Sequence, residues 1–335
     1  MKKFKIVIGI DISKNKLDVC IIENPSSKQY HYLVVSNDES GIKDLLKELK
    51  RFKVNKSELL FCFENTGVYG MHLCYYLQNK QVKYSMVPAI EIKRSKGLVR
   101  GKNDKADSRD IATYAVTHEH KLSFYELPEA DLIKLKLLLT EREKMIKTIL
   151  LYDNTKENES FIEKGVVKEI LIHNKKTIAF LKKQLLTLDQ MISKTINGNE
   201  KIKKQFELAK SVPGVGPQTA INLIVSTRCF SMFENWRQLA CYSGVAPFEY
   251  SSGTSIRGKT KVSHMANKKL KSLLNMAALS AKRVDKQLKE YYERKTKEGK
   301  NGMLVMNALR CKIISRVFAT VKRETPYVNF LKYSA

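Results

Sequence analysis

A chain of 335 residues, 43% of them hydrophobic, can bury a substantial core and is long enough for two domains and a connector. No apolar run approaches a membrane span, and the opening Met1–Lys5 leads into an expected strand rather than a signal-peptide core, so neither a membrane-embedded nor a secreted protein is expected. The 61 basic and 34 acidic residues give a net charge of +27, which predicts a polyanionic partner, with nucleic acid the leading one.

The basic charge is concentrated toward the end of the chain. Residues 251–335 hold 20 Lys and Arg against 5 Asp and Glu, a net charge of +15 and more than half of the excess. An acidic membrane surface is an alternative partner, but it would require a basic amphipathic anchor helix, and the sequence has no evident one. Phosphate contacts are therefore expected mainly from the carboxyl-terminal region.

The cysteines are scattered, with no close pair of the zinc-binding or redox kind. This usage indicates reduced, mostly buried thiols in a cytoplasmic protein. The six are Cys20, Cys62, Cys74, Cys229, Cys241 and Cys311.

The first expected element is a buried strand that carries an acid. Residues 5–14 form an apolar, β-branched run typical of a strand, and Asp11 lies near its end. A second strand over residues 17–22 follows a polar turn. A first strand that carries an acid and then doubles back is how RNase-H-like nuclease domains begin. An edge-facing aspartate at a strand end is the alternative, since a bare carboxylate is costly unless a cation meets it.

Strands and helices alternate after this hairpin. The expected strands cover residues 29–35, 57–63 and 82–87, and the expected helices cover residues 40–52 and 68–79. Thr66 is a candidate cap for the second helix. An antiparallel meander followed by this alternation predicts a mixed α/β domain over residues 1–125.

Glu64 follows the strand at residues 57–63, in the same topological place as Asp11. In an open α/β sheet, the carboxyl ends of the strands are where sites form. A loop glutamate that caps the next helix is the alternative. The matched placement of the two acids favours a functional carboxylate.

A second acidic pair opens a helix that extends to about residue 117. Asp104 and Asp107 are three residues apart, so in a helix they share one face, where two like charges repel unless a cation lies between them. Taken alone, Asp104 as the N-cap with Asp107 in the first turn is ordinary chemistry for a helix start. Together with Asp11 and Glu64, the pair completes the four acids that two-metal nucleases require, holding Mg²⁺ or Mn²⁺ ions about 3.5–4 Å apart.

Residues 126–200 have the composition of a long helical connector. Their apolar residues step alternately by four and three, which is a heptad seam with one polar position. In the second half the seam consists of Val167, Leu171, Asn174, Ile178, Leu181, Leu185, Leu188 and Ile192. Two long helices broken near residues 154–165 are expected, either as an antiparallel hairpin within one chain or as a coiled coil between chains.

The segment from Leu208 to Ala220 predicts a helix-hairpin-helix, because a Pro-Gly-Val-Gly-Pro turn lies between two apolar helical patterns. Gly214 and Gly216 would let backbone N–H groups approach a phosphate, and the next helix would point its positive end at it. Thr219 is expected to contact nucleic acid beside them. A helical hairpin that only packs against protein is the alternative.

A Ser/Gly-rich loop with cations behind it is expected at residues 240–259. The glycine after Ser252 would let the backbone turn so that a hydroxyl faces a phosphate. Composition alone favours a flexible phosphate-contacting loop without covalent chemistry. The cations expected to contact nucleic acid here are Arg257, Lys259, Lys261, Lys268 and Lys269.

Three amphipathic, strongly basic helices are expected over residues 264–282, 286–297 and 303–323. Charge-rich helix faces are usually only solvated, but an imbalance this large indicates phosphate contacts. The helices are expected to pack around the helix-hairpin-helix as an all-α DNA-binding domain over residues 201–335.

Taken together, these segments resemble the insertion-sequence-110 family of transposases, also described as RNA-guided recombinases. The strand at Gly9–Asp11, the segment Glu64–Tyr69 and the segment Lys102–Asp107 look like the RuvC-like DEDD domain of that family. The Pro213–Pro217 turn and the Ser243–Gly253 loop look like its carboxy-terminal transposase domain. The combination covers essentially the whole chain and is specific, although each motif alone is not.

The resemblance implies a role for each matching residue. Asp11, Glu64, Asp104 and Asp107 would be the metal-binding acids, and Ser252 would be the nucleophile that forms a covalent phosphoserine with DNA. The resemblance also implies a structured guide RNA from the element's non-coding end. A homo-oligomer, dimer or tetramer, is implied as well, in which one subunit's acids work with another's serine, in the cytoplasm at the nucleoid.

Two departures from the family pattern are visible. Lys102-Asn103-Asp104 stands where the family often has Lys-Thr-Asp, which changes none of the acids. The stretch Ser263–Lys268 stands where a Lys-x-Gly-Asn run often follows the serine loop. The family's nucleic-acid contacts are therefore not carried over to that stretch.

The sequence predicts a DNA transposase or site-specific recombinase in which metal-bound acids position the scissile phosphate and Ser252 attacks it. One alternative is a Holliday-junction-resolvase-like nuclease, in which metal-activated water attacks and Ser252 only binds phosphate. The other is a non-catalytic nucleic-acid-binding protein, in which the acids are caps and strand ends. Tyr250 and Ser251 compete with Ser252 as nucleophile, and Glu249 is the only acid near them.

Overall fold

The computed structural model describes residues 4–23, 29–97, 103–154, 157, 161–252 and 256–329. For residues 164, 250, 252, 256, 257 and 259 it describes the backbone but not the side chain. The chain forms two compact units, residues 1–127 and residues 128–335. In the described part of the chain, no helix combines the length and the apolar character needed to cross a membrane.

The first unit is built on a five-stranded sheet with the order β3-β2-β1-β4-β5. Its strands are β1 (Ile6–Ile12), β2 (Lys16–Glu23), β3 (Gln29–Ser36), β4 (Leu59–Glu64) and β5 (Lys83–Val87). The first three strands pair antiparallel, and β4 and β5 run parallel to β1. This is the topology expected of an RNase-H-like domain.

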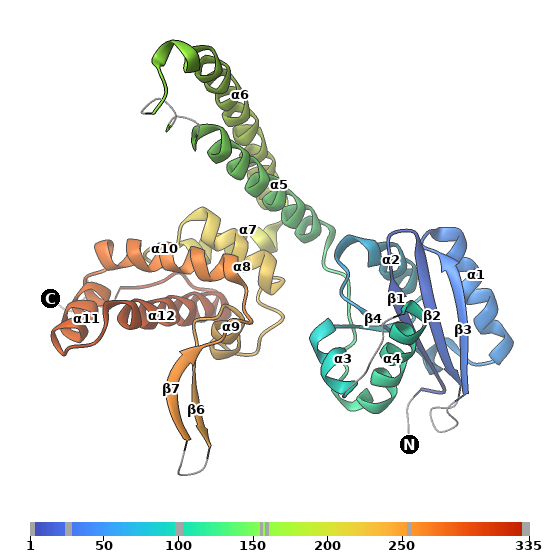
Figure 1. The fold of residues 1–335 in the computed structure, drawn as a ribbon. Helices are drawn as coiled ribbons and strands as arrows, with labels where there is room; N and C mark the ends of the chain where they lie inside the picture. The colour runs from blue at the N-terminus through green and yellow to red at the C-terminus, as the bar shows by residue number, and fades with distance from the viewer. Residues whose placement is uncertain are drawn as a thin grey trace. The chain divides into compact units, whose positions relative to one another are not determined.

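Helices cover both faces of the sheet (Figure 1). One face carries α1 (Glu39–Leu49) and α2 (Met71–Asn79), and the other carries α3 (Ala89–Ser95) and α4 (Asp104–Thr117). Because side chains alternate along a strand, Ile6, Ile8 and Ile10 pack toward α1 and α2, while Val7 packs toward α3 and α4. Burial on both faces explains the nearly continuous apolar runs in β1 and β4.

Short 3-10 helices account for most boundary differences in this unit. They are Lys50–Phe52, Lys56–Glu58, Gly67–Gly70 and Glu119–Lys121. The helix expected from residue 68 begins as one of them, and Thr66 is at its N-cap position, as expected, although its side chain makes no capping hydrogen bond. The sequence analysis also missed α3, which is too short to show a helical period.

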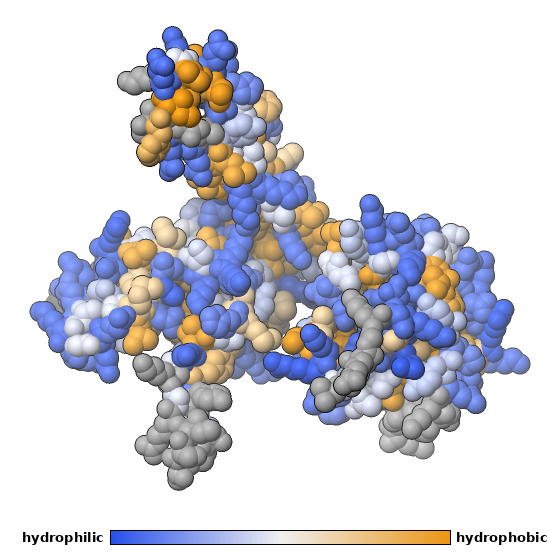
Figure 2. All heavy atoms as spheres, viewed as in Figure 1, coloured by the Kyte–Doolittle hydropathy of each residue, from blue (hydrophilic) through white to orange (hydrophobic). Residues whose placement is uncertain are grey.

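The second unit begins with a long helical hairpin of α5 (Ala130–Asp153) and α6 (Lys164–Asn197), which lie side by side. Val167, Leu171, Asn174 and Ile178 are buried, in agreement with their heptad spacing. Arg142 interrupts the apolar register of α5 because it pairs with Asp189 on α6, Nε to Oδ1 2.6 Å. Figure 2 shows apolar side chains gathered at the end of the hairpin where α6 begins. The exposed apolar residues there include Leu150, Leu151, Phe161, Ile162 and Val166.

The rest of the second unit is a helical domain with one β-hairpin. The helices are α7 (Glu200–Lys210), α8 (Pro217–Thr227), α9 (Trp236–Tyr242), α10 (Lys268–Val284), α11 (Lys286–Lys297) and α12 (Gly302–Arg323). The expected all-α domain is corrected by β6 (Pro247–Ser252) and β7 (Ile256–Val262), which pair antiparallel where a loop was expected. The loop was expected because the segment is rich in Ser and Gly. Four of its residues nevertheless favour strands over helix: Phe248, Tyr250, Ile256 and Val262.

Candidate active site and nucleic-acid surface

Helix α4 lies directly on strand β1, and Gly9 makes this contact. A Cβ atom at residue 9 would lie 2.3 Å from Ala112 N and 2.4 Å from Ser108 O, so only glycine fits between strand and helix. Later residues of α4 pack toward the start of β1, where Ile111 and Tyr114 share a cluster with Val7. The amino-terminal turn of α4 is therefore held near the carboxyl end of β1.

Asp11 and Glu64 lie next to each other at the carboxyl ends of two neighbouring strands. The register of β1 and β4 pairs Ile10 with Phe63, so the following residues, Asp11 and Glu64, are adjacent. Ile10 and Phe63 face the core under α1 and α2, so the two acids point to the opposite face, the one that carries α4. Both acids are half-buried. Their matched placement agrees with the sequence analysis.

Asp104 and Asp107 open α4, but neither is its cap. The N-cap is Asn103, whose side-chain oxygen accepts a hydrogen bond from Ala106 N at 2.7 Å. The alternative interpretation of Asp104 as an N-cap is therefore wrong, because the residue before it already does this work. Asp104 and Asp107 are helical residues in the first turn, where a negative charge is favourable.

Two lysines neutralise the acids around this helix start. Lys16 Nζ lies 2.7 Å from Asp104 Oδ2 and 3.0 Å from Asp18 Oδ2, and hydrogen bonds to Asp104 and then Asp18 raise the pKa of Lys16. Lys96 Nζ lies 2.9 Å from Asp107 Oδ1 and 3.0 Å from Asp110 Oδ2. Burial opposes the charge on Lys96, but hydrogen bonds to the two carboxylates outweigh it and raise the pKa of Lys96.

Asp18 is a fifth acid of this region, which the sequence analysis missed. It pairs directly with Asp11 across β1 and β2 and is only 1% exposed. Like charges opposite each other in a sheet repel, so Asp18 needs compensation. Lys16 and the Tyr32 hydroxyl, which donates to Asp18 Oδ1 at 2.5 Å, supply it. The sequence did contain a signal for Asp18, because it is a charged residue between two apolar residues of an expected strand, Leu17 and Val19.

The acids differ in how well their arrangement and their chemistry suit a divalent metal. Over the residues described, no three or more His, Cys, Asp or Glu side chains form a group that could hold a metal ion. Instead, the ammonium groups of Lys16 and Lys96 lie between carboxylates, where positive charge is required. The donors at the strand ends and at the helix start are all carboxylate oxygens, which fits Mg²⁺ or Mn²⁺ in kind.

Ser252 ends strand β6 and pairs with Ile256 on β7. Its side chain lies outside the described residues, as do the side chains of Tyr250, Arg257 and Lys259. Ser251 is exposed and pairs with Arg257. The three candidate nucleophiles are thus consecutive residues at the end of one strand.

The three residues expected to contact phosphate at the turn between α7 and α8 differ in their exposure. Gly214 has φ +88°, and a Cβ atom there would lie 2.4 Å from Ala277 O and 2.6 Å from Ala281 Cβ, so this glycine packs against α10. Thr219 is 5% exposed. Protein covers Thr219, which argues against its predicted contact with nucleic acid, whereas Gly214 is half-buried and its contact through the backbone N–H stays a prediction. Gly216 has no atom within 4 Å of an added Cβ and still offers an open approach.

The lysines after the hairpin also differ from one another. Lys269 Nζ lies 2.8 Å from Glu143 Oε2 on α5, so this lysine joins two helices of its own chain. Hydrogen bonds from Lys269 and then Lys147 lower the pKa of Glu143. Lys261 and Lys268 are exposed, and neither has a carboxylate within 4.0 Å in the part of the chain that the structure describes.

Two family models match the chain. Residues 8–155 match a model described as a transposase, for the DEDD domain of IS110 elements, and residues 206–293 match the transposase model of the IS116/IS110/IS902 family. The chain belongs to the IS110 family of transposases. This membership confirms the expected family and the expected enzyme class, a DNA transposase or recombinase. It also confirms an RNase-H-like amino-terminal α/β domain followed by a helical region.

This transposase is also similar to individual known proteins. It is 27% identical over 327 residues to the pilin gene-inverting protein of Moraxella bovis, covering 96% of this chain and 98% of that one. It is 34% identical over 117 residues to an uncharacterised insertion element IS110 protein of Streptomyces coelicolor, covering 35% of this chain and 29% of that protein. Among solved structures, Thermus thermophilus RuvC is 14% identical, with a TM-score of 0.27, over 36% of this chain and 99% of that one.

Proposed function

We propose that this transposase cuts and rejoins DNA strands with two sets of groups. Asp11, Glu64, Asp104 and Asp107 hold divalent metal, Mg²⁺ or Mn²⁺, at the scissile phosphate, and Ser252 is the nucleophile. One observation carries the proposal. Asp11 and Glu64 end paired strands on the face that carries α4, and Gly9 lets the helix start with Asp104 and Asp107 approach that edge.

The residues of the chain divide the work as follows. The four carboxylates would hold the divalent metal at the phosphate group, and Asp18 keeps Lys16 beside Asp104. Bound Mg²⁺ would supply positive charge to the phosphate and ease the proton from the attacking oxygen. The Ser252 oxygen loses its proton and bonds to phosphorus, and the deoxyribose oxygen of the cut strand leaves and takes up a proton. The product is a phosphoserine joined to one DNA end.

The proton on Ser252 requires an acceptor from elsewhere. Between residues 240 and 263, Glu249 is the only acid and there is no histidine. The four acids, from the same chain or from another subunit of a dimer or tetramer, are the candidate acceptors. The excess of +15 over residues 251–335 supports binding of a second polyanion, a structured guide RNA from the element's non-coding end, at the nucleoid in the cytoplasm.

Strand exchange with the native flanking DNA and its transcript tests the proposal. Ser252→Ala is expected to abolish exchange and to remove any covalent adduct trapped on suicide DNA. Ser251→Ala and Tyr250→Phe are the matched controls, because they change the two neighbouring hydroxyls and should leave the adduct in place. Mass spectrometry then maps the attachment site.

Three other outcomes would overturn parts of the proposal. An adduct at Ser251 or Tyr250 would move the nucleophile. Metal-dependent cleavage that survives in Ser252→Ala, with no adduct in the unmodified chain, would show that water attacks. Absence of both cleavage and exchange with the correct DNA and RNA would leave a protein that only binds nucleic acid.

A further inference from the structure

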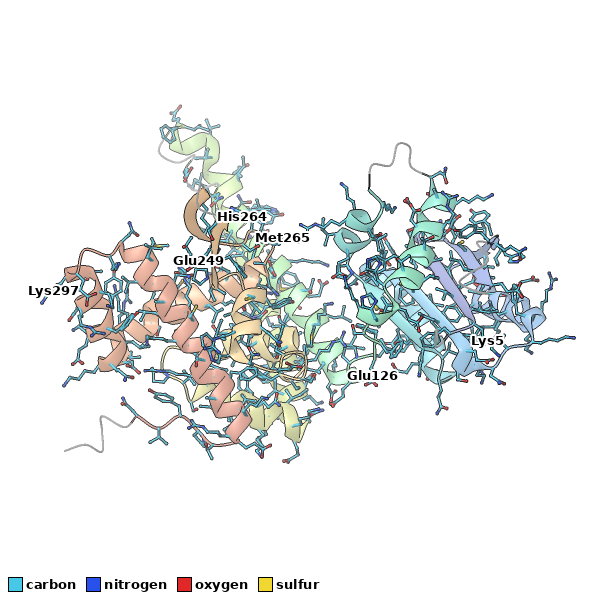
Figure 3. All side chains as sticks on the ribbon, turned by 90° about the horizontal axis from the view of Figure 1, so that it is seen from below. Lys5, Glu126, Glu249, His264, Met265 and Lys297 are labelled. Carbon is cyan, nitrogen blue, oxygen red and sulfur yellow. The ribbon has the colours of Figure 1, made fainter. Side chains whose placement is uncertain are left out.

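An aromatic hollow lies at the base of the β6–β7 hairpin. Its walls include Tyr242 from the end of α9, Phe248 from β6, and Lys261 and Met265 from β7 and the segment after it. The hollow measures about 570 Å³ and opens to solvent. Figure 3 labels Met265 and Glu249 in this part of the chain. None of the described residues that line the hollow is acidic.

Three of the large side chains of this hollow are exposed to solvent. Met265 is 61% exposed, Phe248 48% and Tyr242 38%. Three large apolar groups that share one hollow leave surface in water that a flat, apolar ligand would cover. None of the three is needed to close the core of the second unit, whose buried cluster does not include them.

The ring of Tyr242 is held in place before any ligand arrives. Phe233 packs against it with ring centroids 5.3 Å apart. Asn267 donates from its backbone N to Tyr242 O at 2.9 Å and from Nδ2 to Tyr242 Oη at 3.3 Å. These bonds also hold the segment with Met265 near Tyr242. A fixed ring loses little conformational entropy on binding, which favours a stacking platform.

Positive charge lies beside this platform. Lys261 is directly opposite Phe248 in the register of β6 and β7, and Lys268 follows at the start of α10. Between residues 240 and 268 the chain holds four Lys and Arg against the single acid Glu249. Exposed aromatic rings with adjacent unpaired lysines are the combination by which proteins bind single-stranded nucleic acid, because every base has a stacking face.

We infer that this hollow binds one unstacked base of a DNA strand. Phe248 and Tyr242 would stack on the base, and Lys261 would contact a neighbouring phosphate. Phe248 is four residues before Ser252 on one strand, which is about 13 Å along the chain. The base would therefore lie within a few nucleotides of the phosphate at Ser252. Only this last placement rests on the proposed function; the stacking itself does not.

The test compares two strands that carry the same phosphates. One is a 12-nucleotide single-stranded DNA of mixed sequence, and the other is an abasic strand of equal length. Binding of the full chain is measured by fluorescence anisotropy. Phe248→Ala is expected to weaken binding of the base-bearing strand about 10-fold and to leave the abasic strand unchanged. Phe248→Trp should keep the preference, because a larger ring stacks at least as well.

Control variants separate stacking from charge and from catalysis. Tyr75→Ala removes an aromatic ring on α2 that is 47% exposed, and it should change neither strand. Lys261→Gln should weaken both strands equally and lower the salt dependence by about 0.7 in the logarithmic slope. Ser252→Ala should keep the full preference for bases, so failure of the nucleophile and failure of the hollow are distinguishable.

Several results would overturn the inference. One is that Phe248→Ala weakens the binding of both strands equally, or of neither. The loss could also occur with a matched single-stranded RNA and not with DNA. A 2-aminopurine base in the DNA should be quenched on binding to the unmodified chain and less so in Phe248→Ala, and equal quenching in both proteins would also refute stacking on Phe248.

Discussion

The acidic edge of the first unit and the hairpin surface of the second are built in opposite ways. The acids lie on a packed sheet, Asp18 is 1% exposed, and lysines of the same unit bridge them. The hairpin surface exposes aromatic rings and lysines that have no carboxylate partner within the described residues. The first arrangement fixes the positions of the acids, so substitutions there should disturb the site. The second leaves its side chains accessible to a large partner.

This difference matches two demands of DNA strand exchange. Phosphoryl transfer requires charges placed to within a fraction of an ångström, which rigid elements provide. Binding of a long polyanion depends on many weak contacts spread over an accessible surface. Variants of the first region should therefore act through geometry, whereas variants of the second should act through affinity and its salt dependence.

Replacement of the acids should produce the largest effect. Asp11→Asn and Asp104→Asn are expected to reduce strand cleavage by about 10³-fold or more, as loss of an essential catalytic group does in other enzymes. Both should also weaken Mn²⁺ binding measured by calorimetry, because each removes a charged oxygen donor.

Asp110→Asn is the matched control. It removes another carboxylate from α4 that shares Lys96 with Asp107 but is not one of the four acids. It should keep cleavage within about 10-fold, since it acts only through a positioning contact. Equal losses in Asp104→Asn and Asp110→Asn would show that the four acids are not special.

The contact between β1 and α4 should be the most sensitive packing feature. Gly9→Ala is expected to cost about 3 kcal/mol of unfolding free energy, because the added methyl group overlaps the backbone of α4 at Ser108 and Ala112. Urea denaturation measures this cost.

Gly216→Ala supplies the control in the open turn of the second unit. No atom lies within 4 Å of the added Cβ, and φ is −85°, so the change should stay within about 0.5 kcal/mol. A destabilised Gly216→Ala and an unaffected Gly9→Ala would reverse the comparison.

A smaller effect on stability is expected from ionisation of the Cys62 thiol, two residues before Glu64 on β4. Burial, with a lesser contribution from Glu64, raises the pKa of Cys62 from 9.0 to about 12. Below pH 9 the thiol is protonated in both states and its contribution to stability is complete. Above pH 9 the unfolded chain loses the proton first, so stability falls as pH rises toward 12, by about 0.8 kcal/mol between pH 8 and 9.5.

Urea unfolding at the two pH values checks this prediction. The loss of unfolding free energy between pH 8 and 9.5 should be about 0.8 kcal/mol smaller in Cys62→Ala than in the unmodified chain, whatever the variant's overall stability. As a companion measurement, iodoacetamide should modify Cys241, which lines the open hollow, before Cys62. Equal pH slopes in both proteins would contradict the burial argument.

Two adjacent lysines provide the finest comparison. Lys269→Gln should cost about 0.5 kcal/mol of stability, because its pair with Glu143 is partly exposed, and should barely alter DNA binding. Lys268→Gln should leave stability unchanged and reduce the salt dependence of DNA binding by about one unit of slope. Urea denaturation and a salt titration distinguish them, and identical behaviour of the two variants would show that the ion pair does not decide which lysine meets DNA.

Patterns along the chain located most of the helices and strands, though not α3, β6 or β7. Nearly continuous apolar runs located β1 and β4, and with them Asp11 and Glu64 near the strand ends. The four-and-three spacing of Val167, Leu171 and Ile178 predicted which residues of α6 are buried. The helix α11 was predicted with both its ends. These features depend on neighbours a few residues apart, so the sequence displays them directly.

Contacts between distant residues were decided only by the tertiary structure. Lys16 meets Asp104 across 88 positions of sequence, and Lys269 meets Glu143 across two helices. Only the tertiary structure shows that α10 packs against Gly214 and that Asp18 lies opposite Asp11. Local periodicity carries no information about which element covers which, because packing partners depend on the shape and charge of residues far apart in sequence.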